Sequence, residues 1–382
     1  MVSLLKKVLF LIICLFSFIG FINAEELAPN SKSAILIEAS TGKVLYEKNA
    51  DEALAPASMT KIMTLLLTME AVEKGTIKLS DMVRVSENAA SMGGSQVFLA
   101  ANDEYKLEEI IKAVCIASGN DAAVVLAEAI GGSTDKFVEM MNKKAKELGL
   151  TSTNFVNAYG LDADGHVSSA RDMAIMAREL IKHEIILKYS SIYEENLNKP
   201  DGSSLWMVNT NRLVRFYNGV DGLKTGYTSN AGFCLTATGM WNNMRLISVV
   251  MGAESQDART DDTVSLLNYG KSSYKINTIL KKDDVVDELN VELGEQRRSK
   301  VVPIEDATDL LSVTDEKPKY EYITKLKNVT APIKYGDKVG FVDIYKNGKK
   351  INTVSLTVKK NVEKVKFGTL LKRMIEVVVL GN

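Results

Sequence analysis

A serine and a lysine three positions apart, Ser58 and Lys61, are the residues of this chain with the clearest chemical potential. Residues three apart on a helix share a face, so both side chains would point into the same space. Pro56 marks the expected helix start, whose backbone N–H groups favour a developing oxyanion. The run 62–69 is apolar almost all the way round, which predicts a buried helix that holds the pair rigidly. The spacing alone also fits a serine helix cap beside a solvated lysine.

Ser118-Gly119-Asn120 forms a second polar motif, in a tight corner between two apolar segments of helical spacing, 107–114 and 122–130. Polar side chains in such a corner must satisfy their own backbone or face a cavity. The alternative is a plain turn between helices, with Asn120 or Asp121 as the cap.

Lys224-Thr225-Gly226 begins a strand next to a hairpin of the strands 233–240 and 245–251. The pattern predicts an inner strand whose glycine lets a ligand or another backbone come close. The alternative for Lys224 is an exposed strand lysine.

Lysine is the expected base, because a serine needs a partner that removes its proton. The chain has two histidines, His166 and His183, and neither neighbours a motif, so both are expected at the surface. Lys61 would act in its neutral form, and partial burial together with the like charge of Lys224 would lower its pKa. Two histidines and few cysteines argue against a zinc site, and no cofactor is expected.

The first 24 residues are predicted to be a signal peptide. Lys6-Lys7 precede the apolar run 8–21, and Ala24 offers a small residue for cleavage. An uncleaved anchor is the alternative, since Ile22 is not the usual small residue. Cys115 and Cys234 lie in apolar segments and are expected to be buried thiols. A formal charge of −1 gives no sign of nucleic-acid binding.

The chain divides by pattern into four segments, predicted at 1–24, 25–281, 282–362 and 363–382. The second begins with a hairpin over 34–47 and ends in helical character over 261–280. The third is predicted to be a small all-β domain, because short alternating strands flank Asn347-Gly348, a strong hairpin signal. In the fourth, apolar residues from Phe367 onward share one helical face, which fits a helix lying in a membrane interface and too short to span it. The alternative is a helix packed on the β domain.

The three motifs occur in the order of the Ser/Lys acyl-transfer set. With the runs 56–61, 160–173 and 220–228, the chain resembles the low-molecular-mass penicillin-binding proteins of the D-alanyl-D-alanine carboxypeptidase family, serine peptidases of the β-lactamase-like superfamily. The resemblance implies an α/β (α+β) fold: a catalytic domain with an antiparallel sheet and surrounding helices, then the all-β domain and the C-terminal amphipathic helix.

The resemblance also implies roles for single residues. Ser58 would attack the terminal D-Ala-D-Ala bond with Lys61 as base, and Ser118 would relay a proton to the leaving amine. The expected substrate-binding residues are Asn120, Lys224, Thr225, Gly226, Tyr227 and Arg259. The N–H groups of Ser58 and Tyr227 would form the oxyanion hole, and Arg259, expected in a loop, would lie near the substrate carboxylate.

One departure concerns Asn209-Thr210-Asn211, where some members carry an arginine between the asparagines. The resemblance therefore does not extend to the role of that arginine.

The expected partners are peptidoglycan stem peptides ending in D-Ala-D-Ala, β-lactam antibiotics and, through the C-terminal helix, the extracytoplasmic membrane surface. One alternative is a β-lactamase. Its glutamate motif matches at Glu194-Glu195-Asn196-Leu197-Asn198, but this lies too late in the chain to border the Ser-Lys pair. The other alternative is a catalytically silent penicillin-binding scaffold.

Overall fold

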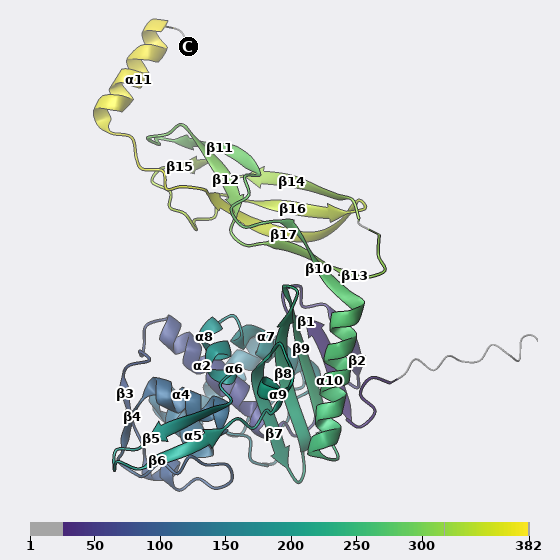
Figure 1. The fold of residues 1–382 in the computed structure, drawn as a ribbon. Helices are drawn as coiled ribbons and strands as arrows, with labels where there is room; N and C mark the ends of the chain where they lie inside the picture. Colours follow the sequence, from purple (N-terminus) through teal and green to yellow (C-terminus); the bar gives the residue numbers. More distant parts are fainter. Residues whose placement is uncertain (1–25, 317, 381–382) are drawn as a thin grey trace, which may run out of the picture.

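The computed structural model describes residues 26–316 and 318–380. The predicted signal peptide, residues 1–24, lies outside them. Figure 1 shows a larger body of helices around a sheet, followed by an elongated all-β part that ends in helix α11 (Phe367–Leu380).

A five-stranded antiparallel sheet forms the centre of the larger body, in the order β2-β1-β9-β8-β7. Side chains of its strands alternate between two cores. Leu36 and Leu246 face the helix α10, whereas Ile35 and Ile247 face the layer of helices on the other side. The expected hairpins are confirmed by these elements: β1 Ser33–Glu38, β2 Val44–Lys48, β7 Val220–Thr228, β8 Gly232–Trp241, β9 Met244–Ala253 and α10 Gln256–Ser273.

The expected inner position of the Lys-Thr-Gly strand is wrong, because β7 is an edge strand. It pairs with β8 on one side, and its other side lies against the turn η1 (Ala57–Thr60). An edge strand keeps one row of backbone groups available to a ligand.

The helical layer is built around α2 (Lys61–Glu73), which follows η1 directly. Nearly every α2 side chain is buried, so the predicted buried helix is confirmed. The layer also contains α3 Glu87–Ala90, α4 Leu107–Ile116, α5 Asn120–Gly131, α6 Thr134–Glu147, α7 Ala170–Leu180 and α8 Glu184–Ser190, together with two small sheets, β3 Met82–Arg84 with β4 Glu104–Lys106 and β5 Glu194–Asn198 with β6 Ser204–Val208. The short helix α9 (Leu213–Phe216) contacts β7 and places Leu213 in the core on the α10 side.

The all-β part begins earlier than the sequence pattern indicates. Helical character was expected to continue to Leu280, but α10 ends at Ser273 and the next seven residues form β10 (Tyr274–Leu280). β10 pairs with β13, and this long-range pairing decides the conformation of a segment whose β-branched residues also suit a strand. A six-stranded sheet follows, in the order β14-β16-β17-β12-β11-β15. The six strands are β11 Asp287–Glu292, β12 Arg298–Pro303, β14 Tyr320–Leu326, β15 Val329–Thr330, β16 Gly340–Lys346 and β17 Lys349–Val358, while β13 (Ala307–Ser312) pairs with β10.

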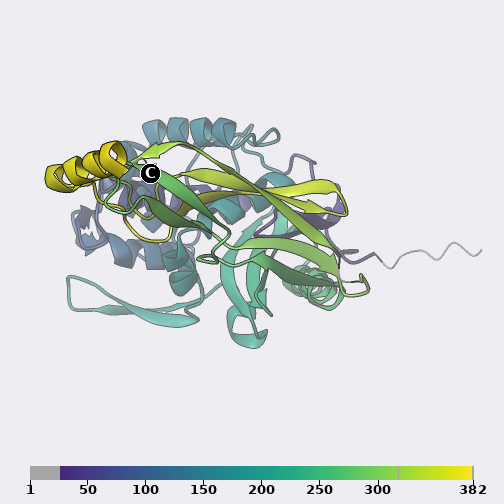
Figure 2. The same ribbon diagram turned by 90° about the horizontal axis from the view of Figure 1, so that it is seen from above.

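The Asn347-Gly348 hairpin between β16 and β17 is confirmed. Both turn residues have positive φ, 51° and 78°, as the tight hairpin turn requires. This turn and α11 stand at opposite ends of the all-β part in both views (Figures 1 and 2).

Helix α11 exposes apolar side chains. Phe367, Leu371 and Ile375 are 79%, 47% and 53% exposed. Arg373 holds the helix to the loop between β11 and β12 by donating to the carbonyl oxygens of Gly294 (2.8 Å) and Glu295 (2.6 Å). Within residues 26–316 and 318–380, no helix is long and apolar enough to cross a membrane.

Candidate active site

Ser58 and Lys61 lie side by side, as their spacing predicts. Lys61 Nζ is 2.9 Å from Ser58 Oγ, and the lysine is fully buried. The serine stands in the 3-10 turn η1 and the lysine at the first position of α2, so the pair spans the junction of two helical segments. The pair has the separation needed for direct proton transfer from the hydroxyl to the amine.

Two further acceptors fix the direction of the amine. Lys61 Nζ donates to Asn120 Oδ1 at 2.6 Å and to the backbone oxygen of Tyr159 at 2.7 Å. A neutral amine has two N–H groups and one lone pair. Since both carbonyl oxygens only accept, the N–H groups face them and the lone pair faces Ser58.

The electrostatics of the site favour this neutral amine. Burial, followed by the positive charge of Lys224, holds the pKa of Lys61 well below its usual value, while Asp121 acts in the opposite direction. The two causes expected from the sequence are therefore both present in the structure.

Asn120 begins α5 and is held at both ends of its side chain. Its Oδ1 accepts from Lys61, and its Nδ2 donates to the backbone oxygen of Gly93 at 2.7 Å. Its backbone N–H donates to Ser95 at 2.7 Å. Ser118, two residues earlier, has a φ of 62° and lines the same hollow as Ser58. The corner between α4 and α5 therefore faces a cavity and is not a plain turn.

Lys224 is the second buried lysine of the site. Burial lowers the pKa of Lys224 to about 7, and the positive charge of Arg259 acts in the same direction. Thr225, the next residue of β7, donates from Oγ1 to Oγ1 of Thr210 at 2.7 Å. Thr210 occupies the position where some members carry an arginine, so here a neutral hydroxyl supports Thr225 directly.

Gly226 brings β7 against the serine. A Cβ at this position would lie 2.9 Å from the oxygen of Pro56 and 3.2 Å from the nitrogen of Ser58. Only glycine permits this approach, so the predicted close contact of backbones is confirmed. Tyr227 follows, 57% exposed and stacked on Phe233 with ring centroids 4.3 Å apart.

Arg259 was expected to lie in a loop, but it lies in the first turn of α10. Ser255 caps that helix by accepting from the backbone N–H of Ala258 at 3.1 Å, so the helix starts before the arginine. Arg259 is 5% exposed, and within the described part of the chain its Nε has no hydrogen-bond partner. This buried donor borders a hollow that contains the serine.

The hollow has a volume of about 540 Å³ and unites most of the expected residues. Lys61, Asn120 and Lys224 are buried and do not belong to its lining. Sequence reasoning missed several lining residues, which come from segments without a motif. The lining consists of Ser58, Ser95, Ser118, Tyr193, Val208, Asn209, Thr210, Arg212, Thr225, Gly226, Tyr227, Phe233, Gln256 and Arg259.

His166 is buried, contrary to the expected surface position. It is 4% exposed because its loop folds back over η1. The N–H of Val156 donates to Nδ1 at 2.9 Å, so the proton is assigned to Nε2, which donates to Thr60 Oγ1 at 2.8 Å. Burial lowers the pKa of His166 to about 4, so the ring is neutral near pH 7. His183 is also partly buried, with Nδ1 3.4 Å from a carboxylate oxygen of Glu73.

The carbonyl of Tyr159 is the contact that sequence reasoning missed altogether. The signal for it is the neighbouring Gly160, which has a φ of 91°. A Cβ there would lie 1.9 Å from the backbone oxygen of Ala57, so this loop can approach η1 only through glycine.

Other predictions concern thiols, metals and the glutamate motif. Cys115 and Cys234 are buried free thiols, as expected. In residues 26–316 and 318–380 no group of three or more metal-ligating side chains is present. Glu194 begins the strand β5 and does not line the hollow, while Glu195 pairs with Lys112 at 2.8 Å.

The sequence was compared with known families and proteins. A profile of the D-alanyl-D-alanine carboxypeptidase family matches residues 22–255, and one of the C-terminal domain of penicillin-binding protein 5 matches residues 274–364. The D-alanyl-D-alanine carboxypeptidase DacF of Bacillus subtilis is 48% identical over 350 residues, which cover 91% of this chain and 90% of that protein. The chain therefore belongs to the D-alanyl-D-alanine carboxypeptidase family.

Solved structures agree with this assignment. Penicillin-binding protein 5 from Haemophilus influenzae is 33% identical with a TM-score of 0.69, over 88% of this chain and 98% of that chain. Penicillin-binding protein D2 from Listeria monocytogenes, in its ampicillin-bound form, is 30% identical with a TM-score of 0.57, over 63% of this chain and 97% of that chain. The resemblance to low-molecular-mass penicillin-binding proteins and the expected fold class are confirmed.

Replacement of Gly160 tests the contact between the loop and η1. Gly160→Ala should slow acylation by a fluorescent penicillin by about a hundredfold, because its Cβ displaces the Tyr159 carbonyl from Lys61. Gly165→Ala is the matched control: its φ is 76°, but the nearest atom to its Cβ is 3.7 Å away. Equal acylation rates for the two variants would show that the loop does not position the lysine.

Proposed function

We propose that this chain is a serine-type D-Ala-D-Ala carboxypeptidase that removes the terminal D-alanine from peptidoglycan stem peptides. The observation that carries this proposal is the 2.9 Å contact between Lys61 Nζ and Ser58 Oγ, with the other directions of the amine held by two carbonyl oxygens. Family membership supplies the substrate class.

In the first stage Ser58 Oγ attacks the carbonyl carbon of the penultimate D-alanine. Its proton passes to the lone pair of Lys61, and the backbone N–H groups of Ser58 and Tyr227 stabilise the oxyanion. The C–N bond then breaks, and Ser118 passes a proton to the leaving amine. D-Alanine leaves, and water hydrolyses the ester in the second stage.

The terminal carboxylate of the substrate is assigned to the positive end of the hollow. Lys224 and Arg259 supply charge, and Thr225 supplies a hydroxyl group on the edge strand. Gly226 lets the peptide lie along β7. Asn120 would bind the substrate amide through Nδ2, in place of the Gly93 carbonyl that this group now contacts.

β-Lactams are expected to acylate the same Ser58, since a relative of this fold is known in an ampicillin-bound form. A β-lactamase must also hydrolyse the acyl-enzyme rapidly, and neither glutamate of the motif Glu194–Asn198 lines the hollow. A catalytically inactive scaffold would not require the lone pair of Lys61 to face Ser58.

We also propose the four segments expected at 1–24, 25–281, 282–362 and 363–382, with the second boundary moved to 273/274 because β10 pairs with β13 of the all-β part. The first segment would direct export, and the last would attach the protein peripherally to the extracytoplasmic membrane face. The exposed Phe367, Leu371 and Ile375 of α11 support the attachment. The all-β part would then stand between the membrane and Ser58.

Release of D-alanine from a peptide ending in Lys-D-Ala-D-Ala tests the proposed activity. The wild type should release it and Ser58→Ala should not, while replacement of the exposed Ser191 by alanine should leave release unchanged. No release by folded wild type would contradict the proposal. Fast penicillin hydrolysis without a lasting acyl-enzyme would support the β-lactamase instead.

Replacing each of the two buried lysines should change different kinetic constants. Lys61→Ala removes the base, so kcat should fall by about 10²- to 10⁴-fold with little change in reversible binding. Lys224→Ala removes a carboxylate anchor, so KM should rise as well. Steady-state kinetics on the peptide measure both effects, with Lys74→Ala, at the exposed end of α2, as the control. Wild-type kinetics in both variants would refute the assigned roles.

A further inference from the structure

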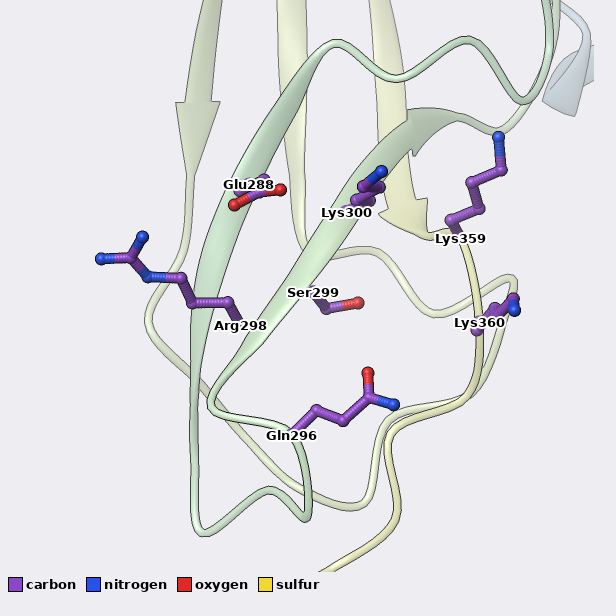
Figure 3. A pocket seen from close by; sticks show the side chains of 7 residues that line it. All are labelled: Glu288, Gln296, Arg298, Ser299, Lys300, Lys359 and Lys360. Carbon is purple, nitrogen blue, oxygen red and sulfur yellow. The ribbon is translucent and has the colours of Figure 1, made fainter.

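A second hollow lies in the all-β part, far from Ser58, and has a volume of about 460 Å³ (Figure 3). It opens where β12 and the chain after β17 separate. Their ladder ends at the pair Val301 and Val358, and a last bond joins the N–H of Lys359 to the oxygen of Lys300. The chains meet again at the bridge between Gly294 and Lys364. The hollow is therefore a gap in the sheet, with residues 296–300 on one side.

The side chains around this gap are mostly cationic. Figure 3 shows that they belong to Glu288, Gln296, Arg298, Ser299, Lys300, Lys359 and Lys360. Four are positive and one is negative. Among the described residues, none of the four cations forms an ion pair, although Lys359 Nζ donates to the backbone oxygen of Asp283 at 3.2 Å. Glu288 is the cross-strand neighbour of Lys300, so three positive charges remain in excess around the gap. These like charges repel one another and attract an anion.

The hollow adjoins the base of α11. Arg373 of that helix donates to the oxygens of Gly294 and Glu295, and the next residue, Gln296, lines the hollow. Six residues separate Lys360 from Phe367, the first residue of α11, so the hollow and the exposed apolar helix lie at the same end of the molecule (Figure 1). An interface that receives α11 would bring lipid headgroups toward these cations.

We propose that this hollow binds the phosphate headgroup of an anionic membrane lipid. The inference rests on the proposed attachment by α11, which would hold the hollow at the membrane surface. Ammonium groups donate several hydrogen bonds to phosphate oxygens, and Gln296 and Ser299 add neutral donors, whereas Arg298 points away from the gap across β11 (Figure 3). The helix would supply apolar attachment, and the hollow would supply preference for anionic lipid.

The test uses the chain from Glu25 to Asn382 and two kinds of vesicle, phosphatidylcholine alone and phosphatidylcholine with phosphatidylglycerol. The wild type should bind the anionic vesicles more tightly. The variant Lys300→Gln/Lys359→Gln/Lys360→Gln should lose roughly a hundredfold in binding to anionic vesicles and keep its binding to neutral ones.

A matched control removes three charges elsewhere in the same part of the chain. Lys275, Lys319 and Lys349 are exposed and lie toward the catalytic body, at the start of β10 and beside the β16–β17 turn. Their replacement by glutamine should leave the lipid preference within a few-fold of wild type. Both variants should cleave the D-Ala-D-Ala peptide in solution like the wild type, which shows that they are folded.

These outcomes distinguish the contribution of the hollow to membrane binding from that of α11. Equal losses in the two variants, or no preference of the wild type for anionic vesicles, would overturn the hollow as a headgroup site. If a chain ending at Val365 still binds neutral vesicles, the attachment by α11 is wrong, whatever the hollow does. Tighter binding of a soluble polyol-phosphate polymer than of anionic vesicles, lost in the first variant, would replace the lipid by a wall polymer and refute the proposal.

Discussion

The buried amine of Lys61 is the group on which the rest of the site depends. Its three contacts come from three separate parts of the chain: η1 with Ser58, the start of α5 with Asn120, and the loop that contains Tyr159. An ionised ammonium at this position would carry a desolvation penalty of several kcal/mol. The neutral amine avoids most of this penalty and is also the form that can accept the serine proton. Burial of Lys61 therefore contributes to proton transfer from Ser58 as well as to packing.

The surrounding elements hold this arrangement in place. Neutral His166 joins the Tyr159 loop to η1 through Thr60, so the loop is hydrogen-bonded to the turn that carries Ser58. On the other side β7 lies at the edge of the sheet, where Gly226 lets it touch η1. The edge position leaves backbone groups for an extended peptide, which an inner strand could not offer. Because burial lowers the pKa of Lys224 to about 7, a bound substrate carboxylate would stabilise the charged form of this lysine.

The sequence predicted the parts of the site that depend on local spacing. Ser58 and Lys61 share a face because a helical turn brings residues three apart together. The corner at Ser118 was predictable because the apolar pattern is interrupted there, between the segments 107–114 and 122–130. Contacts between distant segments were not predictable in this way. The Tyr159 carbonyl belongs to the backbone and has no residue signature, and His166 is buried only because its loop covers η1. The same holds for Tyr274–Leu280, where pairing with β13 outweighs a helical pattern.

The pH dependence of kcat on the D-Ala-D-Ala peptide tests the central claim that neutral Lys61 is the base. Measurement under saturation reports the enzyme-substrate complex, in which the substrate carboxylate fixes the charge of Lys224. The expectation for a neutral Lys61 base is that kcat reaches half of its maximum at a pH well below 10.5, the ordinary lysine value, because burial and Lys224 lower the pKa of Lys61. A kcat that continues to rise until the pH approaches 10.5 would contradict it.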